Sequence, residues 1–187
     1  MFKKLIPLMA ILCVSGLAMA QDKEPPKWTY VQAGFVDFNP DEGPKDDGWF
    51  AGGSIGFLKM IHVFAEYDGI GDTTFWNAGA GWHGLLGDPA DVYAQVEWND
   101  VKVDVPGGDV SDNGYEVAAG VRWKFLKWLE AQGELNWSDF DEAGSDVGGK
   151  VGVLFTFLGD KLGAGASYEV INNADQLRVF ARWNFGR

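Results

Sequence analysis

From Trp28 onward, apolar or aromatic residues alternate with small, polar or charged residues in one stretch after another. A period of two residues is that of a β-strand whose two faces meet different surroundings. The last stretch shows this most clearly, with Leu177, Val179, Ala181, Trp183 and Phe185 on one side and Gln176, Arg178, Arg182 and Asn184 on the other.

The alternating stretches predict about ten strands, with eight as the alternative. Polar, glycine and proline residues separate them, and the prolines after residue 27 fall in connections, as expected because proline cannot donate to a sheet ladder. The expected strands are 28–38, 48–58, 60–69, 74–84, 90–103, 114–125, 127–138, 146–157, 161–171 and 176–186.

No helical period interrupts these strands, and lipid requires every backbone polar group to be paired within the protein. The pattern therefore predicts an all-β fold, a transmembrane antiparallel up-and-down β-barrel. The alternative is a soluble β-sandwich or lipocalin-like barrel, in which the aromatic residues would fill the core and the charged residues would face outward.

The connections alternate in character, which gives the barrel an orientation. Polar loops are expected at 39–47, 104–113 and 139–145, and tight turns around Lys59, Leu126 and 159–160. Long loops outside and short turns inside are typical of outer-membrane barrels.

Aromatic residues at outward positions form two groups, as expected for the two membrane interfaces. Toward the loops lie Trp49, Tyr67, Trp76, Trp98, Tyr115, Trp137 and Tyr168, and toward the turns lie Phe57, Trp82, Trp123, Phe125, Phe155, Phe157, Trp183 and Phe185.

The start of the chain is typical of an export signal. Two lysines precede an apolar stretch, Leu5–Leu17, and Ala18–Ala20 is a small-residue cleavage site. A transmembrane helix is the alternative, but this stretch is short for spanning a bilayer. We expect a signal peptide at 1–20, a short periplasmic leader at 21–27 and an outer-membrane barrel domain at 28–187.

Composition excludes some partners. The formal net charge is −12, which argues against nucleic acid because phosphate binding needs basic patches. The single cysteine, Cys13, lies in the expected signal peptide, so neither a disulfide nor a cysteine-based metal site is expected. The sequence predicts no cofactor.

With its export signal, paired aromatic belts and two-faced strands, the chain resembles the small OmpA-like outer-membrane barrels of Gram-negative bacteria. Its ending, Leu177–Phe185, is similar to the final strand that such proteins present to the barrel-assembly machinery, although Gly186 and Arg187 follow the aromatic residue. The resemblance implies a place in the outer membrane, in contact with the lipid bilayer and lipopolysaccharide. It specifies architecture and not activity.

The expected inward face is rich in charge, which is costly unless it is paired. Hairpin geometry predicts Arg122 opposite Glu130, Lys150 against Glu134, and Arg178 within reach of Glu169. The expected lumen charge network comprises Glu66, Glu97, Glu116, Arg122, Glu130, Glu134, Lys150, Glu169, Arg178 and Arg182.

The width of a ten-stranded barrel favours a lumen filled by side chains over a pore. We therefore expect a non-enzymatic barrel whose task is surface interaction or envelope integrity, with a narrow channel for ions or small solutes as the alternative. An enzyme is the third reading, because His62 and His83 should both point inward near the turn end, where hydrogen bonding within the lumen is the simpler role.

The expected loops are rich in carboxylates. Hard oxygen ligands grouped in this way could contact divalent cations that bridge to lipopolysaccharide phosphates, although a solvated surface is the simpler explanation and no calcium-loop motif is present. The candidate cation contacts are Asp41, Glu42, Asp46, Asp47, Asp139, Asp141 and Glu142.

Overall fold

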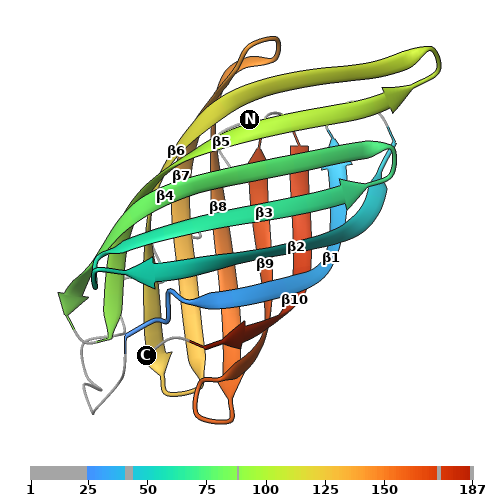
Figure 1. Cartoon of the computed structure of the whole chain (residues 1–187). Coiled ribbons are helices and arrows are strands. Elements are labelled where there is room, and N and C mark those ends of the chain that lie inside the picture. Colours follow the sequence, from blue (N-terminus) through green and yellow to red (C-terminus); the bar gives the residue numbers. More distant parts are fainter. Residues whose placement is uncertain (1–24, 41–43, 88, 172–173, 186–187) are drawn as a thin grey trace, which may run out of the picture.

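The computed structural model is a closed barrel of ten antiparallel strands (Figure 1), and it describes residues 25–40, 44–87, 89–171 and 174–185. The expected signal peptide and the leader up to residue 24 lie outside the described residues. The strands are β1 (Tyr30–Pro40), β2 (Asp46–Phe57), β3 (Ile61–Ile70), β4 (Thr73–Gly87), β5 (Ala90–Val105), β6 (Gly108–Leu126), β7 (Leu129–Phe140), β8 (Gly144–Phe157), β9 (Leu162–Ile171) and β10 (Ala174–Asn184).

Each strand pairs with its neighbours in sequence, and β1 closes the cylinder by pairing with β10. In that seam Gln32 lies opposite Arg182 and Val36 opposite Arg178. Among the described residues, no helix is long and apolar enough to cross a membrane. The expected up-and-down topology and the count of ten strands are confirmed.

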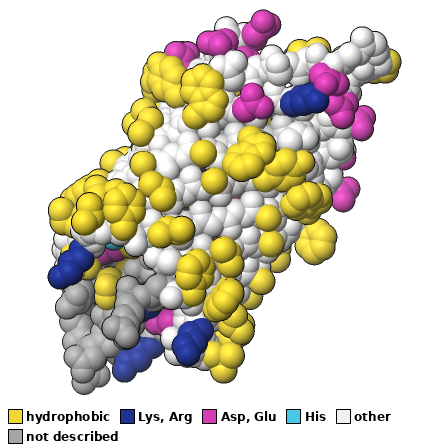
Figure 2. Space-filling model, in the orientation of Figure 1, with side chains coloured by type: hydrophobic (Ala, Val, Ile, Leu, Met, Phe, Trp, Pro, Cys, Tyr) yellow, Lys and Arg dark blue, Asp and Glu magenta, His cyan; other side chains and the backbone are white. Residues whose placement is uncertain are grey.

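The outer wall is apolar, as the alternation predicts. Trp98 and Trp183 are each 55% exposed and Phe35 is 77% exposed, so these large side chains cover the outside instead of a core. Figure 2 shows hydrophobic side chains spread over the wall, with acidic side chains gathered at the end where the β5–β6 hairpin projects. The arrangement contradicts the soluble alternative, which places the charges outside.

Several expected boundaries are wrong. The segment 104–113 is not a loop, because β5 and β6 continue beyond the wall and only Pro106 and Gly107 connect them. Alternating Val103, Val105 and Val110 carry the strand pattern through the acidic residues that suggested a loop. β8 likewise starts at Gly144, inside the expected loop 139–145. The two ends therefore differ in strand extension more than in loop length.

We call the end with the β5–β6 hairpin the loop end, and the opposite end, where β1 begins and β10 ends, the turn end. Turns at 58–60, 127–128 and 158–161 close the turn end, as expected. Leu58, Lys59, Leu158 and Asp160 have positive φ angles there, a strained geometry that tight turns impose.

Apolar side chains fill part of the lumen near the loop end. Val36, Phe50 and Ile70 form a buried cluster, with Phe38, Phe75 and Phe180 packed against it. Sequence alternation marked the inward positions but did not indicate this apolar group. The polar network described next therefore occupies only part of the lumen.

Candidate functional site within the lumen

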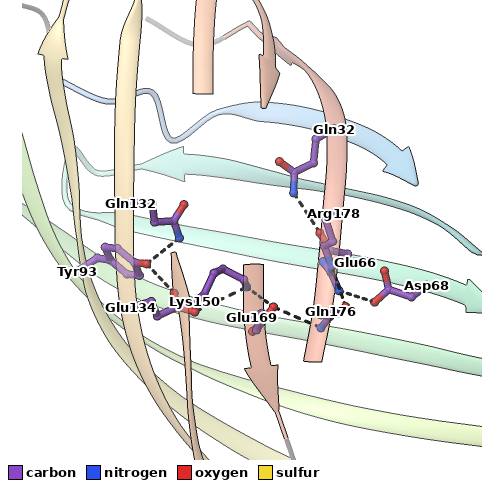
Figure 3. A network of polar contacts seen from close by, with 10 residues as sticks. All are labelled: Gln32, Glu66, Asp68, Tyr93, Gln132, Glu134, Lys150, Glu169, Gln176 and Arg178. Atoms are coloured by element: carbon purple, nitrogen blue, oxygen red, sulfur yellow. Dashed lines mark hydrogen bonds and ion pairs between the residues drawn. The ribbon is translucent and has the colours of Figure 1, made fainter. Parts of the chain in front are cut away.

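A continuous polar network crosses the middle of the lumen (Figure 3). On one side the Tyr93 hydroxyl donates to Glu134 Oε2 at 2.6 Å and accepts from Gln132 Nε2 at 2.8 Å. Lys150 Nζ lies 3.7 Å from Glu134 Oε1 and 3.1 Å from Glu169 Oε2. One ammonium group therefore serves two carboxylates.

The network continues from Glu169 through β10 to β3. Gln176 Nε2 donates to Glu169 at 3.4 Å and its Oε1 accepts from Arg178 Nε at 3.0 Å. Arg178 pairs with Glu66 through Nη1 and with Asp68 through Nη2, the latter at 3.0 Å. These contacts tie strands on opposite sides of the barrel together.

Arg182 connects the network to the layer below. Its Nε and Nη2 donate to Gln32 Oε1 at 3.1 and 2.7 Å, and Gln32 Nε2 donates to Glu66 at 3.1 Å. The guanidinium also lies 4.0 Å from the ring centroid of Tyr30. Within the described residues Arg182 has no direct carboxylate partner, and stacking and hydrogen bonds hold its guanidinium in the lumen.

Trp28 forms the floor of the lumen at the turn end. Its indole stacks on His62 and His83, with ring centroids 4.4 and 4.5 Å away, and its Nε1 donates to Asp91 Oδ2 at 2.7 Å. The Arg122 guanidinium lies 4.5 Å from the same ring. Trp28 was expected to start the first strand, but β1 begins at Tyr30. The residues just before β1 instead turn inward across the barrel.

Arg122 binds the residues that form this floor. Its Nε donates to Glu130 Oε1 at 2.7 Å, and its Nη1 donates to the backbone carbonyl of Lys27 at 2.9 Å. The side chains of Arg122 and Glu130 are almost fully buried. The segment leading into β1 is therefore bound by a buried charge as well as by stacking.

A further ion pair lies at the turn end. Lys124 Nζ pairs with Asp160 Oδ2, and the Thr156 hydroxyl donates to Asp160 Oδ1 at 2.7 Å. Burial raises the pKa of the Asp160 carboxyl, but the hydrogen bonds from Lys124 and Thr156 outweigh this and hold the pKa below its ordinary value. Asp160 therefore carries its charge in the folded barrel.

A cavity of about 380 Å³ lies above the floor. Its lining extends from Trp28, His62 and Arg122 at the bottom to Asp100 and Asp112 near the loop end. Glycines widen the lumen next to large side chains, since a Cβ on Gly120 would lie 2.6 Å from the Tyr93 ring. The lumen is thus not fully packed with side chains.

The structure brings together most of the residues that the sequence placed in the lumen, with some changes of partner. Lys150 and Glu134 occupy the expected register. Arg122 and Glu130 are in contact, but Arg122 lies opposite Gln132, because the hairpin turns at 127–128 and not at Leu126 and its register shifts between Trp123 and Leu126. Arg178 is connected to Glu169 through Gln176, and its direct partners are Glu66 and Asp68, which alternation could not reveal because β3 is distant in sequence.

Two expected network members, Glu97 and Glu116, line the cavity opposite each other on β5 and β6. Neither forms an ion pair with a base within the described residues. Trp28, Asp68, Tyr93, Lys124 and Asp160 were not among the expected site residues, although the inward parity of Asp68, Tyr93 and Lys124 was a usable signal.

The histidines lie where they were expected, at the turn end and 5.5 Å apart between ring centroids. His83 Nδ1 is 3.9 Å from Asp91 Oδ2, but that oxygen already accepts from Trp28. Because Trp28 stacks on both rings, the cluster forms a packed layer.

The acidic residues at the loop end are dispersed. Asp46, Asp47, Asp141 and Glu142 are exposed, and Asp139 accepts from the Tyr115 hydroxyl at 3.2 Å. Asp41 and Glu42 lie outside the described residues. In the part of the chain that the structure describes, no three His, Cys, Asp or Glu side chains are placed to hold a metal ion.

No family model and no curated protein matches the chain. Among solved structures, it is similar to the NanC porin, with a TM-score of 0.51 and 9% identity over 84% of this chain and 100% of that one. The KdgM porin gives a TM-score of 0.50 and 11% identity over 84% and 99%. The N-terminal β-barrel domain of Pseudomonas aeruginosa OprF gives 0.49 and 11% over 84% and 100%. The likeness to the NanC and KdgM porins shows that the chain has the fold of the outer-membrane β-barrels.

Proposed function

We propose that this protein is exported to the outer membrane of a Gram-negative bacterium and spans it with the loop end outside. The apolar outer wall and the aromatic groups near both ends support this placement. The bilayer and lipopolysaccharide would surround the wall, and the barrel-assembly machinery would insert it. The acidic loop end would then face the surroundings of the cell.

We further propose that the barrel is non-enzymatic and closed by a charge-bridged lumen. The observation that carries this proposal is Trp28, which stacks on both His62 and His83, donates a hydrogen bond to Asp91 and lies beneath the Arg122 guanidinium. A side chain held by this many contacts is a fixed obstruction. A closed barrel suits surface interaction or envelope integrity, in which the outer wall and the loop end make the contacts and the lumen carries no solute.

Conductance in planar bilayers tests this function. The refolded barrel should give no stable current steps, whereas Trp28→Ala should give steps because the floor loses its central ring. Tyr115→Ala removes an outward aromatic residue and serves as the control, which should remain silent. Reproducible steps from the unaltered barrel, equal to those of Trp28→Ala, would show that Trp28 does not close the lumen.

A narrow channel is the second candidate, and the cavity of about 380 Å³ favours it. In that case the unaltered barrel would conduct, and charge changes in the lumen would alter the current. Glu134→Gln should then change ion selectivity, since Glu134 faces the cavity. Silence from the unaltered barrel together with steps from Trp28→Ala would exclude this candidate.

A further inference from the structure

Three turns at the turn end share a short sequence pattern. Residues 57–59 read Phe-Leu-Lys where β2 turns into β3, and residues 125–127 repeat the same three where β6 turns into β7. Residues 157–161, between β8 and β9, read Phe-Leu-Gly-Asp-Lys. Each of these turns therefore places a lysine close to large apolar side chains.

Two leucines of this pattern are exposed at backbone positions that leucine rarely adopts. Leu58 has a φ of 54° and is 79% exposed, and Leu158 has a φ of 53° and is 70% exposed. Glycine or asparagine takes such angles at lower cost. Because the barrel covers neither side chain, a contact outside the chain has to offset the strain.

The apolar turn residues are continuous with the outer wall. Trp128, next to Lys127, is exposed and stacks on the outward Phe155, with ring centroids 5.9 Å apart. The three turns join β2 to β3, β6 to β7 and β8 to β9, so they are spread around the closed cylinder. A ring of this kind matches a bilayer that surrounds the barrel, whereas a partner protein would dock on one side.

The exposed charge at the turn end is basic. The exposed charged side chains described there are those of Lys59, Lys127 and Lys161. Asp160 is paired with Lys124, and the other described carboxylates at this end are buried. Figure 2 shows basic side chains beside hydrophobic ones at the turn end and acidic side chains at the loop end. The turn end therefore attracts anions at the level where the wall meets the membrane interface.

We propose that the turn end binds the headgroups of anionic phospholipids, such as phosphatidylglycerol, in the inner leaflet of the outer membrane. Leu58 and Leu158 enter the boundary between headgroups and acyl chains, and the lysine ammonium groups donate to the lipid phosphates. The inference rests on the proposed placement of the barrel in the outer membrane. It adds the class of lipid and the residues that select it.

Electron spin resonance of spin-labelled lipids tests this proposal in phosphatidylcholine vesicles that contain the refolded barrel. Labelled phosphatidylglycerol and labelled phosphatidylcholine are compared by the fraction that the protein surface immobilises. We expect phosphatidylglycerol to be preferred by about two- to fivefold, because a lysine close to the membrane surface attracts anionic lipid. High salt should reduce the preference, because it screens exposed charges.

Variants separate the turn end from the rest of the barrel. Lys59→Gln with Lys127→Gln and Lys161→Gln should abolish the preference, and arginine at the same three positions should keep it. Lys45→Gln with Lys102→Gln removes exposed basic side chains from the loop end and is the control, which should also keep it. Equal immobilisation of both lipids by the unaltered barrel, or an unchanged preference in the triple glutamine variant, would overturn the inference and leave the membrane placement standing. A barrel that immobilises neither lipid would overturn both.

The depth of the leucines gives a second measurement. Nitroxides attached to Leu58→Cys and Leu158→Cys, in a barrel without Cys13, should be more accessible to oxygen dissolved in lipid than to a water-soluble nickel chelate. Asp141→Cys, in an exposed turn at the loop end, is the control and should show the opposite order. Greater accessibility of positions 58 and 158 to the nickel chelate would show that these turns lie in water and would overturn the inference.

Discussion

Tyr93 on β5 donates a 2.6 Å hydrogen bond to Glu134 on β7, across the position of Gly120 on the strand between them. The three residues are aligned in register, and the missing side chain at Gly120 leaves room for the phenol. A Cβ at this position would lie 2.6 Å from both the Tyr93 ring and the Gly133 carbonyl. The hydrogen bond from Tyr93 to Glu134 therefore depends on a glycine at position 120.

Gly120→Ala should destabilise the barrel by about 1–3 kcal/mol, the usual cost of overpacking. Urea unfolding followed by tryptophan fluorescence measures it. Gly133→Ala is the matched control, since a Cβ there meets nothing within 4 Å and should change stability by less than about 0.5 kcal/mol. Equal effects of the two substitutions would contradict the packing described for Tyr93.

Breaking the buried pair of Arg122 and Glu130 should be costly. Glu130→Gln leaves the guanidinium buried without a counter-charge, which should lower the free energy of unfolding by about 3 kcal/mol. The same urea titration applies. Lys102 and Asp109 form an exposed pair at 2.6 Å, so Asp109→Asn should have no measurable effect. A similar loss of unfolding free energy in both variants would mean that burial does not determine how much an ion pair contributes to stability.

The turn end should show a pH dependence centred on Asp160. Its pKa is lower in the folded barrel than in the unfolded chain, so the charged form stabilises the fold above the unfolded pKa, and this contribution disappears as pH falls through the folded pKa. Asp160→Asn should therefore be less stable than the unaltered barrel at pH 7. The difference should vanish in strong acid.

Urea midpoints between pH 7 and pH 2 measure this difference. Asp141→Asn, in an exposed turn at the loop end, controls for the loss of one acidic residue and should show no such gap. A gap between Asp160→Asn and the unaltered barrel that stays constant across the range would show that the Asp160 charge is not the source of the stabilisation.

Much of the fold was predictable because the period of two sets the face of every residue. Outward Trp98 and inward Glu97 follow from parity alone, as does the closed membrane barrel that separates them. Strand ends were less predictable, since the segment 104–113 combines acidic residues with a valine alternation. The segment forms strands, as the valine alternation indicates, because the backbone pairing of β5 with β6 continues beyond the barrel wall.

The lumen contacts were predictable only within hairpins. Lys150 and Glu134 are partners across one turn, whereas Arg178 reaches Glu66 and Asp68 because barrel closure brings β10 and β3 to the same lumen. Trp28 was expected to start the first strand, and local alternation did not reveal that β1 begins only at Tyr30 and that the residues before it cross the lumen. Long-range closure therefore sets the partners that local alternation leaves open.

The central claim is that the strands present one face to lipid and the other to the lumen, and spin labelling along β7 tests it most directly. The labels are attached to single cysteines in a barrel from which Cys13 has been removed. Nitroxides at Gly133, Leu135 and Trp137 should be accessible to oxygen dissolved in lipid. Nitroxides at Gln132, Asn136 and Ser138 should be shielded from it. This account predicts that alternation with a period of two. Lipid accessibility at the even-numbered positions, or equal accessibility at all six, would contradict it.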